Sequence, residues 1–359
     1  AVGFNAARDT TSGIANVAVG TSALVSNTTG NSNTAIGLDC LQQNTTASNN
    51  VGVGRDALKL TTTGVNNTAI GMNCLDANTT GDQNTGVGAS CLSSVTTGDY
   101  NTAVGWYSGF TTDTGYENVS MGGWSLESNT TGYRNVAIGY EALRYGNSGY
   151  QNTAVGWRSM RSGATTGAEN AAIGTESLRN LTTGSYNSGI GRSAGEQITT
   201  GANNTCLGRN AGRGASPSGE ITTGNNIVCL GDDNVTDLFC NDTSISASDS
   251  RDKTDITDFS IGLDWIKALR PVTYKWDKRT WYGTPDGSKK ATRLNLGFLA
   301  QEALEVEKAN GYGDSSDNML ICNLTGDGMK YGMKYERLIP ILVNAIKELS
   351  AEVELLKAA

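Results

Sequence analysis

The sequence lacks histidine, has only four prolines and has no long apolar run. Without histidine, the Ser-His-Asp and Cys-His classes of catalysis are excluded, as is any metal site with histidine ligands. No apolar run approaches the roughly 20 residues that span a membrane, so we expect no membrane insertion. Because the formal charge of −8 includes no basic run, we expect neither nucleic acid nor an anionic membrane as a partner.

Glycine is abundant instead, with 46 residues in a chain of 359, while hydrophobic residues make up 37%. A chain of this length predicts two domains. Its composition does not supply one large apolar core, so we expect thin, repetitive cores or interfaces between chains.

The sequence Asn-Val-Ala-Val-Gly at residues 16–20 recurs with a period of 17 residues. Similar segments begin every 17 residues as far as position 152, and then at positions 170, 187 and 204. A last copy at residues 227–231 follows an insertion around residues 214–220. Residues 1–3 fit the same repeat, so we expect the chain to begin within a repeat of a longer protein.

Each repeat begins with the asparagine as position 1, has a small residue at position 8 and a Thr-Thr-Gly turn that ends near position 15. The alternation around the alanine at position 3 predicts a strand, and we expect two short strands and two turns per coil. Stacked coils place identical residues about 4.8 Å apart, where the asparagines can form a hydrogen-bonded ladder. Residues 1–240 are therefore predicted to form a mainly β, homotrimeric parallel β-solenoid or β-roll of 17-residue coils. The strand motif resembles the head repeats of trimeric autotransporter adhesins.

The repeat also accounts for most of the seven cysteines. Cys40, Cys74 and Cys91 fall at position 8, where other repeats have alanine or serine, and Cys206 and Cys229 replace the alanine of position 3. They are predicted to pack as small hydrophobic residues, so we expect no metal and no cofactor.

Aromatic residues concentrate between residues 100 and 186, whereas Phe4 is the only one before them. Most fall at variable positions of the coil such as 6, 7, 16 and 17, which are predicted to face outward or to lie at coil edges. Exposed aromatic clusters mark binding sites, here for a host-surface glycan or receptor, or they pack chains together in an oligomer. Both interpretations remain open. The candidate receptor-binding residues are Trp106, Tyr107, Trp124, Tyr140 and Trp157.

Residues 241–359 have an ordinary, charged composition and are predicted to form a second, α+β domain. A short amphipathic helix over residues 261–269 ends before Pro271, residues 272–276 alternate as a strand, and a second helix begins at residues 297–302. A final long helix carries apolar residues at spacings of four and three, which is a heptad seam. The seam consists of Leu342, Ile346, Leu349, Val353 and Leu356.

The two domains meet at the pattern S-D-x-R-x-K, formed by Ser248, Asp249, Arg251 and Lys253. Downstream follow L-x-P-V-x-Y-x-W at residues 269–276, then G-x-x-A-Q-E at residues 297–302, and the leucine-rich helix. This order resembles the self-cleaving C-terminal chaperones of phage tail fibres and tailspikes, the endosialidase-type S74 peptidase family. The resemblance implies a domain that trimerises, guides its chains into a β-structure, and then cuts itself off between Ser248 and Asp249.

The chemistry of such a cleavage is consistent with the residues present. With no histidine available, Ser248 as a nucleophile needs Lys253 as its base. A lysine that acts as a base near pH 7 needs a pKa lowered by roughly 3 units, or about 4 kcal/mol, and Arg251 can supply part of the repulsion. Five residues separate Ser248 from Lys253, so neither a helix nor an extended chain brings them together. We therefore expect the segment to bend, or the pair to be completed when chains assemble.

The sequence is thus interpreted as the distal part of a bacteriophage tail fibre, assembled in the host cytoplasm and located in the virion. Its shaft is structural and a candidate for host attachment, and its C-terminal domain is a single-turnover serine peptidase with a Ser-Lys dyad. Two alternatives stay open, a bacterial trimeric surface adhesin and a glycan-degrading tailspike. The tailspike alternative lacks a paired-carboxylate arrangement among scattered residues such as Asp113, Glu117 and Glu127.

Overall fold

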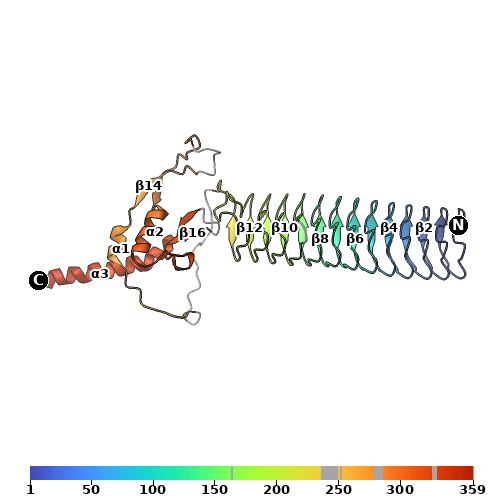
Figure 1. Ribbon diagram of the computed structural model, residues 1–359, viewed down its shortest axis with the longest axis horizontal. Coiled ribbons are helices and arrows are strands. Elements are labelled where there is room, and N and C mark those ends of the chain that lie inside the picture. Colours follow the sequence, from blue (N-terminus) through green and yellow to red (C-terminus); the bar gives the residue numbers. More distant parts are fainter. Residues whose placement is uncertain (163–164, 236–249, 251–252, 279–285, 326–329, 359) are drawn as a thin grey trace. The chain divides into compact units, whose positions relative to one another are not determined.

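The repeat forms one three-residue strand per coil, and thirteen of these strands stack into a single parallel sheet (Figure 1). The computed structural model describes residues 1–162, 165–235, 250, 253–278, 286–325 and 330–358. The chain divides into two compact units, Ala1–Asn234 and Val235–Ala359. The predicted boundary at residue 240 lies outside the described residues.

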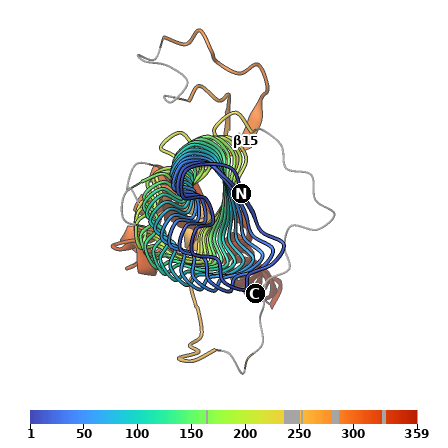
Figure 2. The same cartoon turned by 90° about the vertical axis from the view of Figure 1, so that its right-hand side faces the viewer.

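The strands of the sheet follow one another in sequence order, from β1 to β13. Equivalent repeat positions pair directly, as Ala18 with Ala35, and each strand buries its central residue between two outward-facing ones. The predicted parallel β-solenoid of 17-residue coils is confirmed, and the coils superpose in the end-on view (Figure 2). The strands are β1 Val17–Val19, β2 Thr34–Ile36, β3 Val51–Val53, β4 Thr68–Ile70, β5 Thr85–Val87, β6 Thr102–Val104, β7 Val119–Met121, β8 Val136–Ile138, β9 Thr153–Val155, β10 Ala171–Ile173, β11 Ser188–Ile190, β12 Thr205–Leu207 and β13 Val228–Leu230.

The first asparagine of each coil links the coils into the expected ladder. The backbone N–H of Asn33 donates to Oδ1 of Asn16 at 2.9 Å, and Nδ2 of Asn33 donates to the carbonyl of Ala47 at 2.8 Å. The same link continues to the last coil, where the backbone N–H of Ile227 donates to Oδ1 of Asn204 at 3.0 Å across an offset of 23 residues. The side-chain amide of each of these asparagines donates one hydrogen bond and accepts another from the backbone of the next coil. These buried hydrogen bonds hold the coils in register.

The prediction of a second strand in each coil is wrong for the described repeats. Ser22 and Leu24, at positions 7 and 9, have φ values of 53° and 55°, and the later coils repeat this pair of left-handed residues. A left-handed conformation interrupts an extended strand and costs a leucine roughly 1–2 kcal/mol. Burial offsets the cost, because the side chain of Leu24 is fully enclosed and such burial contributes roughly 1.5–3 kcal/mol.

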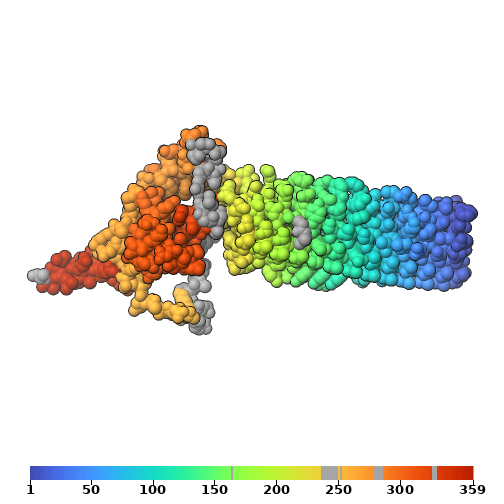
Figure 3. Space-filling view, viewed as in Figure 1, coloured from blue at the N-terminus to red at the C-terminus, as the bar shows by residue number. Residues whose placement is uncertain are grey.

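Glycine at position 5 is required where one coil passes close to the next. Gly37 has a φ of 143°, and a Cβ at this position would lie 2.2 Å from the carbonyl oxygen of Gly54 in the following coil. The space-filling view of the shaft shows successive coils in close contact along its length (Figure 3).

In the coils from Cys40 to Cys74, the interior matches side-chain size between position 8 and position 3 of the next coil. Where position 8 is Cys40, position 3 is Gly52, and a Cβ on Gly52 would lie 2.5 Å from Sγ of Cys40. Where position 8 is Ala57, position 3 is Ala69, and both are fully buried. The cysteines thus pack as small core residues, as predicted, and burial raises the pKa of Cys40 to about 12.

We expect Gly52→Ala to destabilise the shaft by about 1–3 kcal/mol, because the added methyl overlaps Sγ of Cys40. The double variant Cys40→Ala with Gly52→Ala recreates the natural Ala57 and Ala69 pair and should recover most of that loss. Denaturant unfolding followed by far-UV circular dichroism measures both variants. If the two changes prove additive, the proposed size matching is wrong.

Within its described residues, the C-terminal unit packs three α-helices and two small antiparallel sheets around its own core. Its elements are α1 Leu263–Ala268, β14 Val272–Tyr274, β15 Asn295–Gly297, α2 Ala300–Ala309, η3 Ser316–Asn318, β16 Cys322–Leu324, β17 Tyr331–Met333, η4 Tyr335–Arg337 and α3 Leu338–Ala358. β14 pairs with β15, and β16 pairs with β17. Trp265, Ile321 and Ile341 are among the buried core residues. The predicted α+β unit that ends in a long helix is confirmed.

Two predicted boundaries in this unit shift. The second helix begins at Ala300 rather than Gly297, because Gly297 ends the strand that pairs with β14. The predicted strand over residues 272–276 ends at Tyr274, because Tyr274 pairs with Asn295, the first residue of β15.

Candidate functional site

The proposed cleavage stretch is described only in part. Ser248, Asp249 and Arg251 lie outside the described residues. Lys253 is exposed, and its backbone N–H donates to the carbonyl oxygen of Ser250 at 3.3 Å.

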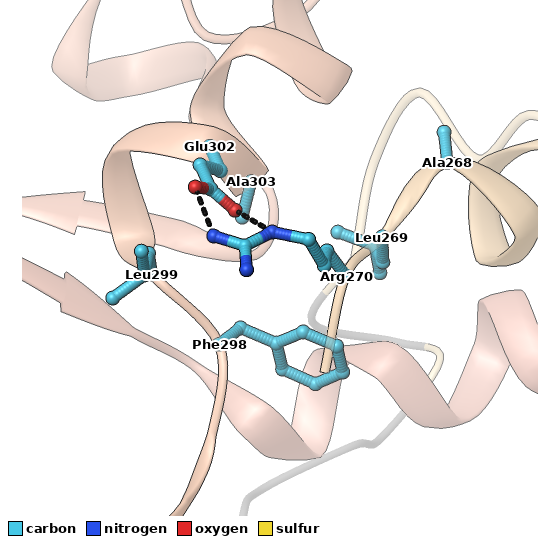
Figure 4. Close-up of a pocket in the computed structure, with 7 residues that line it drawn as sticks. All are labelled: Ala268, Leu269, Arg270, Phe298, Leu299, Glu302 and Ala303. Atoms are coloured by element: carbon cyan, nitrogen blue, oxygen red, sulfur yellow. Dashed lines mark hydrogen bonds and ion pairs between the residues drawn. The ribbon is translucent and has the colours of Figure 1, made fainter. Parts of the chain in front are cut away.

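The two downstream motifs come together in the structure. Val272 pairs with Gly297 in the sheet formed by β14 and β15. The guanidinium of Arg270 binds the carboxylate of Glu302 with both ends, with Nε 3.0 Å from Oε2 and Nη2 2.5 Å from Oε1 (Figure 4). The hydrogen bonds and charge of Arg270 hold the pKa of Glu302 below its ordinary value. The pair lies at a small pocket lined by Ala268, Leu269, Arg270, Phe298, Leu299, Glu302 and Ala303.

Gly297 of the second motif has a steric role. A Cβ at this position would lie 2.4 Å from the hydroxyl oxygen of Tyr335, which also accepts the backbone N–H of Phe298 at 3.3 Å. The motif residues Arg270, Gly297 and Glu302 therefore fix the sheet to α2 and to the start of α3. Their contacts hold the elements of the C-terminal fold together.

The lysine and cysteine side chains of the C-terminal unit differ in their ionisation. Burial, together with the charge of Arg337, lowers the pKa of Lys334 below its ordinary value. Burial raises the pKa of Cys322 to about 12, so its thiol is a core group and not a nucleophile. Sequence reasoning did not single out Lys334, because a lowered lysine pKa depends on burial, for which no motif exists.

A buried carboxylate in α2 was also missed. Glu307 has no exposed surface, and its carboxylate accepts backbone N–H groups from Leu320, Ile321 and Cys322 at 3.2, 2.6 and 2.7 Å. It thereby fixes the start of β16 against α2. The N–H groups that Glu307 accepts lie 13 to 15 residues away along the chain, and no local sequence pattern predicts such a contact.

The five candidate receptor-binding aromatics lie on one ridge of the shaft, at the turn that follows the strands. Trp106, Tyr140 and Trp157 are 50%, 43% and 41% exposed. Tyr107 and Trp124, at position 7, are half-buried. The ring of Trp124 lies between Trp106 and Tyr140, with centroids 4.5 Å and 5.4 Å away, because Gly123 leaves position 6 of that coil without a side chain.

A buried ion-pair network holds this ridge. Glu141 has a side chain that is 5% exposed and binds Arg144, Arg158 and Arg161 at 2.6 to 2.7 Å. Burial alone raises the pKa of Glu141, but the three arginines outweigh it and leave the pKa below its ordinary value. The guanidinium of Arg158 also lies 4.2 Å from the centre of the Trp157 ring. Arginines of this network thus lie against two rings of the ridge, Trp124 and Trp157.

A second aromatic ridge lies on the other side of the strands, at position 16. The rings of Tyr116, Tyr133 and Tyr150 stack with centroids 5.0 Å apart and interplanar angles of 1° and 3°. Sequence reasoning treated all aromatics as one zone. The repeated Gly-Tyr pairs 17 residues apart are the signal that would have separated this ladder from the first ridge.

The scattered carboxylates of the shaft have structural partners. Glu117 binds Arg134 at 2.6 Å, Glu127 binds Arg144 at 2.5 Å, and Asp113 accepts a hydrogen bond from Thr96. They do not form a facing pair of the kind that glycoside hydrolysis uses. Within the described residues, no group of three or more candidate ligands is arranged to hold a metal ion. The helices in the described parts of the chain include none that is long and apolar enough to span a membrane.

Comparison with known proteins supports the assignment of the C-terminal unit. The family model of the chaperone of endosialidase, peptidase S74, matches residues 248–312. The match begins at Ser248 and extends past the end of α2. No curated protein and no solved structure matches the chain.

Proposed function

We propose that this chain is the distal part of a phage tail fibre whose C-terminal unit drives homotrimerisation and then cuts itself off between Ser248 and Asp249. The observation that carries the proposal is the family match that begins at the proposed nucleophile. The ion pair of Arg270 and Glu302 supports it, because it joins the two downstream motifs within the matched residues.

The cleavage requires a specific direction of attack. A serine hydroxyl that attacks its own carbonyl carbon closes a strained β-lactone ring, whereas the hydroxyl of Ser248 from a neighbouring chain meets no such strain. Oγ then bonds to the carbonyl carbon, its proton passes to Nζ of Lys253 and on to the departing amine of Asp249, and the C–N bond breaks. Water hydrolyses the resulting ester and regenerates the hydroxyl. This route makes cleavage conditional on assembly.

The long helix supports association between chains. Ile339 extends the predicted seam by one position, and the seam residues from Ile339 to Leu356 are 40–78% exposed within one chain. Apolar residues at this spacing pack against a partner helix in a coiled coil. The outward strand positions of the shaft add further exposed apolar side chains, such as Ile36, Ile70 and Ile173.

One experiment tests assembly and cleavage together. The expressed chain should give a fragment that begins at Asp249 on a denaturing gel, identified by its N-terminal sequence. The shaft that remains should sediment as a trimer. A chain that stays intact and monomeric would overturn the proposal.

A second candidate function is host attachment through a surface glycan. The observation that favours it is the ridge of exposed and ordered rings at Trp106, Tyr140 and Trp157. Aromatic faces that are fixed in place bind saccharides with little loss of conformational entropy. Packing between chains is the competing role for the same rings.

We expect Trp106→Ala combined with Trp157→Ala to reduce adsorption of the fibre to host cells by at least about tenfold, since central aromatic contacts are typically worth 2 kcal/mol or more. The matched control is Tyr100→Ala with Tyr186→Ala, which removes two equally exposed aromatics from position 17. Adsorption rates of the two double variants are compared at equal trimer concentration. Unchanged adsorption of the tryptophan variant would assign the ridge to packing or structure.

A further inference from the structure

The helix α3 holds the segment that leads from the proposed cleavage stretch into the fold. Nδ2 of Asn344 donates to the carbonyl oxygen of Phe259 at 2.5 Å and lies 3.4 Å from that of Ile261. Oε2 of Glu348 accepts the backbone N–H of Leu263 at 2.7 Å. Two residues one helical turn apart thus bind the backbone of residues 259–263.

This contact is close as well as polar. A Cβ on Gly262 would lie 2.5 Å from Oε1 of Glu348 and 2.7 Å from the backbone nitrogen of Ala345. Gly262 also precedes α1, so Glu348 satisfies one of the first backbone N–H groups of that helix. The segment therefore has one position on α3 and little room to shift.

The binding residues and the apolar seam lie on roughly opposite sides of α3. At about 100° per residue, Asn344 and Glu348 are turned about 140° from the centre of the seam formed by Leu342, Ile346 and Leu349. Ile341 and Ala345, which are buried, lie between the two groups on one side. One helix therefore presents the proposed assembly surface on one side and the bound segment on the other.

We propose that Asn344 and Glu348 are positioning residues that couple assembly through α3 to self-cleavage, an inference that rests on the cleavage proposed above. Six residues separate Lys253 from Phe259, so the anchored segment confines Lys253 to within about 20 Å of α3. When the seams of neighbouring chains pack, α3 becomes fixed in the assembly. The bound segment then gives the chain that carries Lys253 one fixed starting point in the assembly.

The test uses two changes that preserve side-chain size and have opposite expected outcomes. Asn344→Asp replaces the donor with an acceptor that faces the carbonyl of Phe259, and it should slow cleavage at least about tenfold. Glu348→Gln keeps an acceptor for the N–H of Leu263 and should cleave at the wild-type rate. Glu348→Ala removes that acceptor and should be slow. Glu352→Gln, one turn further along the exposed side, controls for the change in charge.

Each variant is made in the full chain, and the ratio of cut to uncut chain is measured at fixed times after induction. The oligomeric state of the same sample is measured by light scattering. Asn344→Asp and Glu348→Ala trimers that cleave at the wild-type rate would overturn the coupling. An Asn344→Asp chain that does not assemble also contradicts it, because coupling requires that assembly and cleavage can be separated. If the wild-type chain itself stays uncut, the proposed self-cleavage fails instead.

Discussion

A chain that carries Ser248→Ala should assemble as a trimer and remain uncut, whereas the wild-type chain should release residues 249–359. Removal of the hydroxyl eliminates the nucleophile and leaves the seam of α3 and the Arg270–Glu302 pair unchanged. Loss of a catalytic serine reduces rates by at least about 10³-fold, so no fragment should be visible on a denaturing gel. Efficient release of the fragment from this variant would contradict the cleavage proposal and show that residues 248–253 are a linker.

The identity of the base follows from a comparison of two lysines. Lys253→Ala should block cleavage, and Lys253→Arg should also block it, because a guanidinium does not give up its proton near neutral pH. Lys334 is the appropriate control, since burial already lowers its pKa. If Lys334→Ala prevents cleavage in assembled trimers while Lys253→Ala does not, the base is Lys334.

Mixed trimers test the direction of attack. When a tagged Ser248→Ala chain is expressed together with the wild-type chain, attack between chains predicts that part of the tagged chain is cut. Attack within each chain predicts that every tagged chain stays whole. The two outcomes differ on one gel that is stained for the tag.

The second large effect is expected in the stability of the C-terminal unit. Glu307→Ala should destabilise this unit by about 3–5 kcal/mol, because it leaves three N–H groups at the start of β16 without an acceptor, two of them buried. Glu307→Gln retains an acceptor oxygen, so the stability of this variant should lie between those of the wild type and of Glu307→Ala. The measurement is hydrogen exchange at residues 320–322 in the full chain with Ser248→Ala.

Glu305→Ala is the matched control for Glu307→Ala. Glu305 belongs to the same helix but is exposed and pairs with Lys308 at 3.0 Å, and such pairs contribute roughly 0–1 kcal/mol. The protection of residues 320–322 should therefore be unchanged in this variant. Equal protection in the Glu305 and Glu307 variants would show that Glu307 does not fix β16.

The repeated part of the fold was predictable because its contacts join equivalent residues. An asparagine that recurs every 17 residues, such as Asn16 and Asn33, predicts both the coil length and the ladder that the structure contains. The second predicted strand failed because binary patterning does not reveal backbone handedness. Leu24 and Leu41 are apolar at a position that suits a strand, yet both adopt a left-handed conformation.

The C-terminal unit was predictable in its elements and less so in its contacts. The heptad spacing of α3 and the end of α1 before Pro271 follow from local patterns. The roles of Glu307, Asn344 and Glu348 depend on backbone groups from segments that are distant in sequence. Such contacts form only when tertiary packing brings the segments together, so residue type and spacing do not predict them.

The asparagine ladder has a consequence for how solenoids of this kind change length. Every coil presents the same acceptor to the next, and the coil of 23 residues between Asn204 and Ile227 still makes the link. Gain or loss of whole coils therefore leaves both neighbours with intact bonds and alters reach by about 4.8 Å per coil. Extra residues within a coil change its outline but not its height. Duplication of a 51-nucleotide segment adds one 17-residue coil and lengthens the solenoid by about 4.8 Å. The surface of the solenoid can vary independently, because the variable residues lie at the turns.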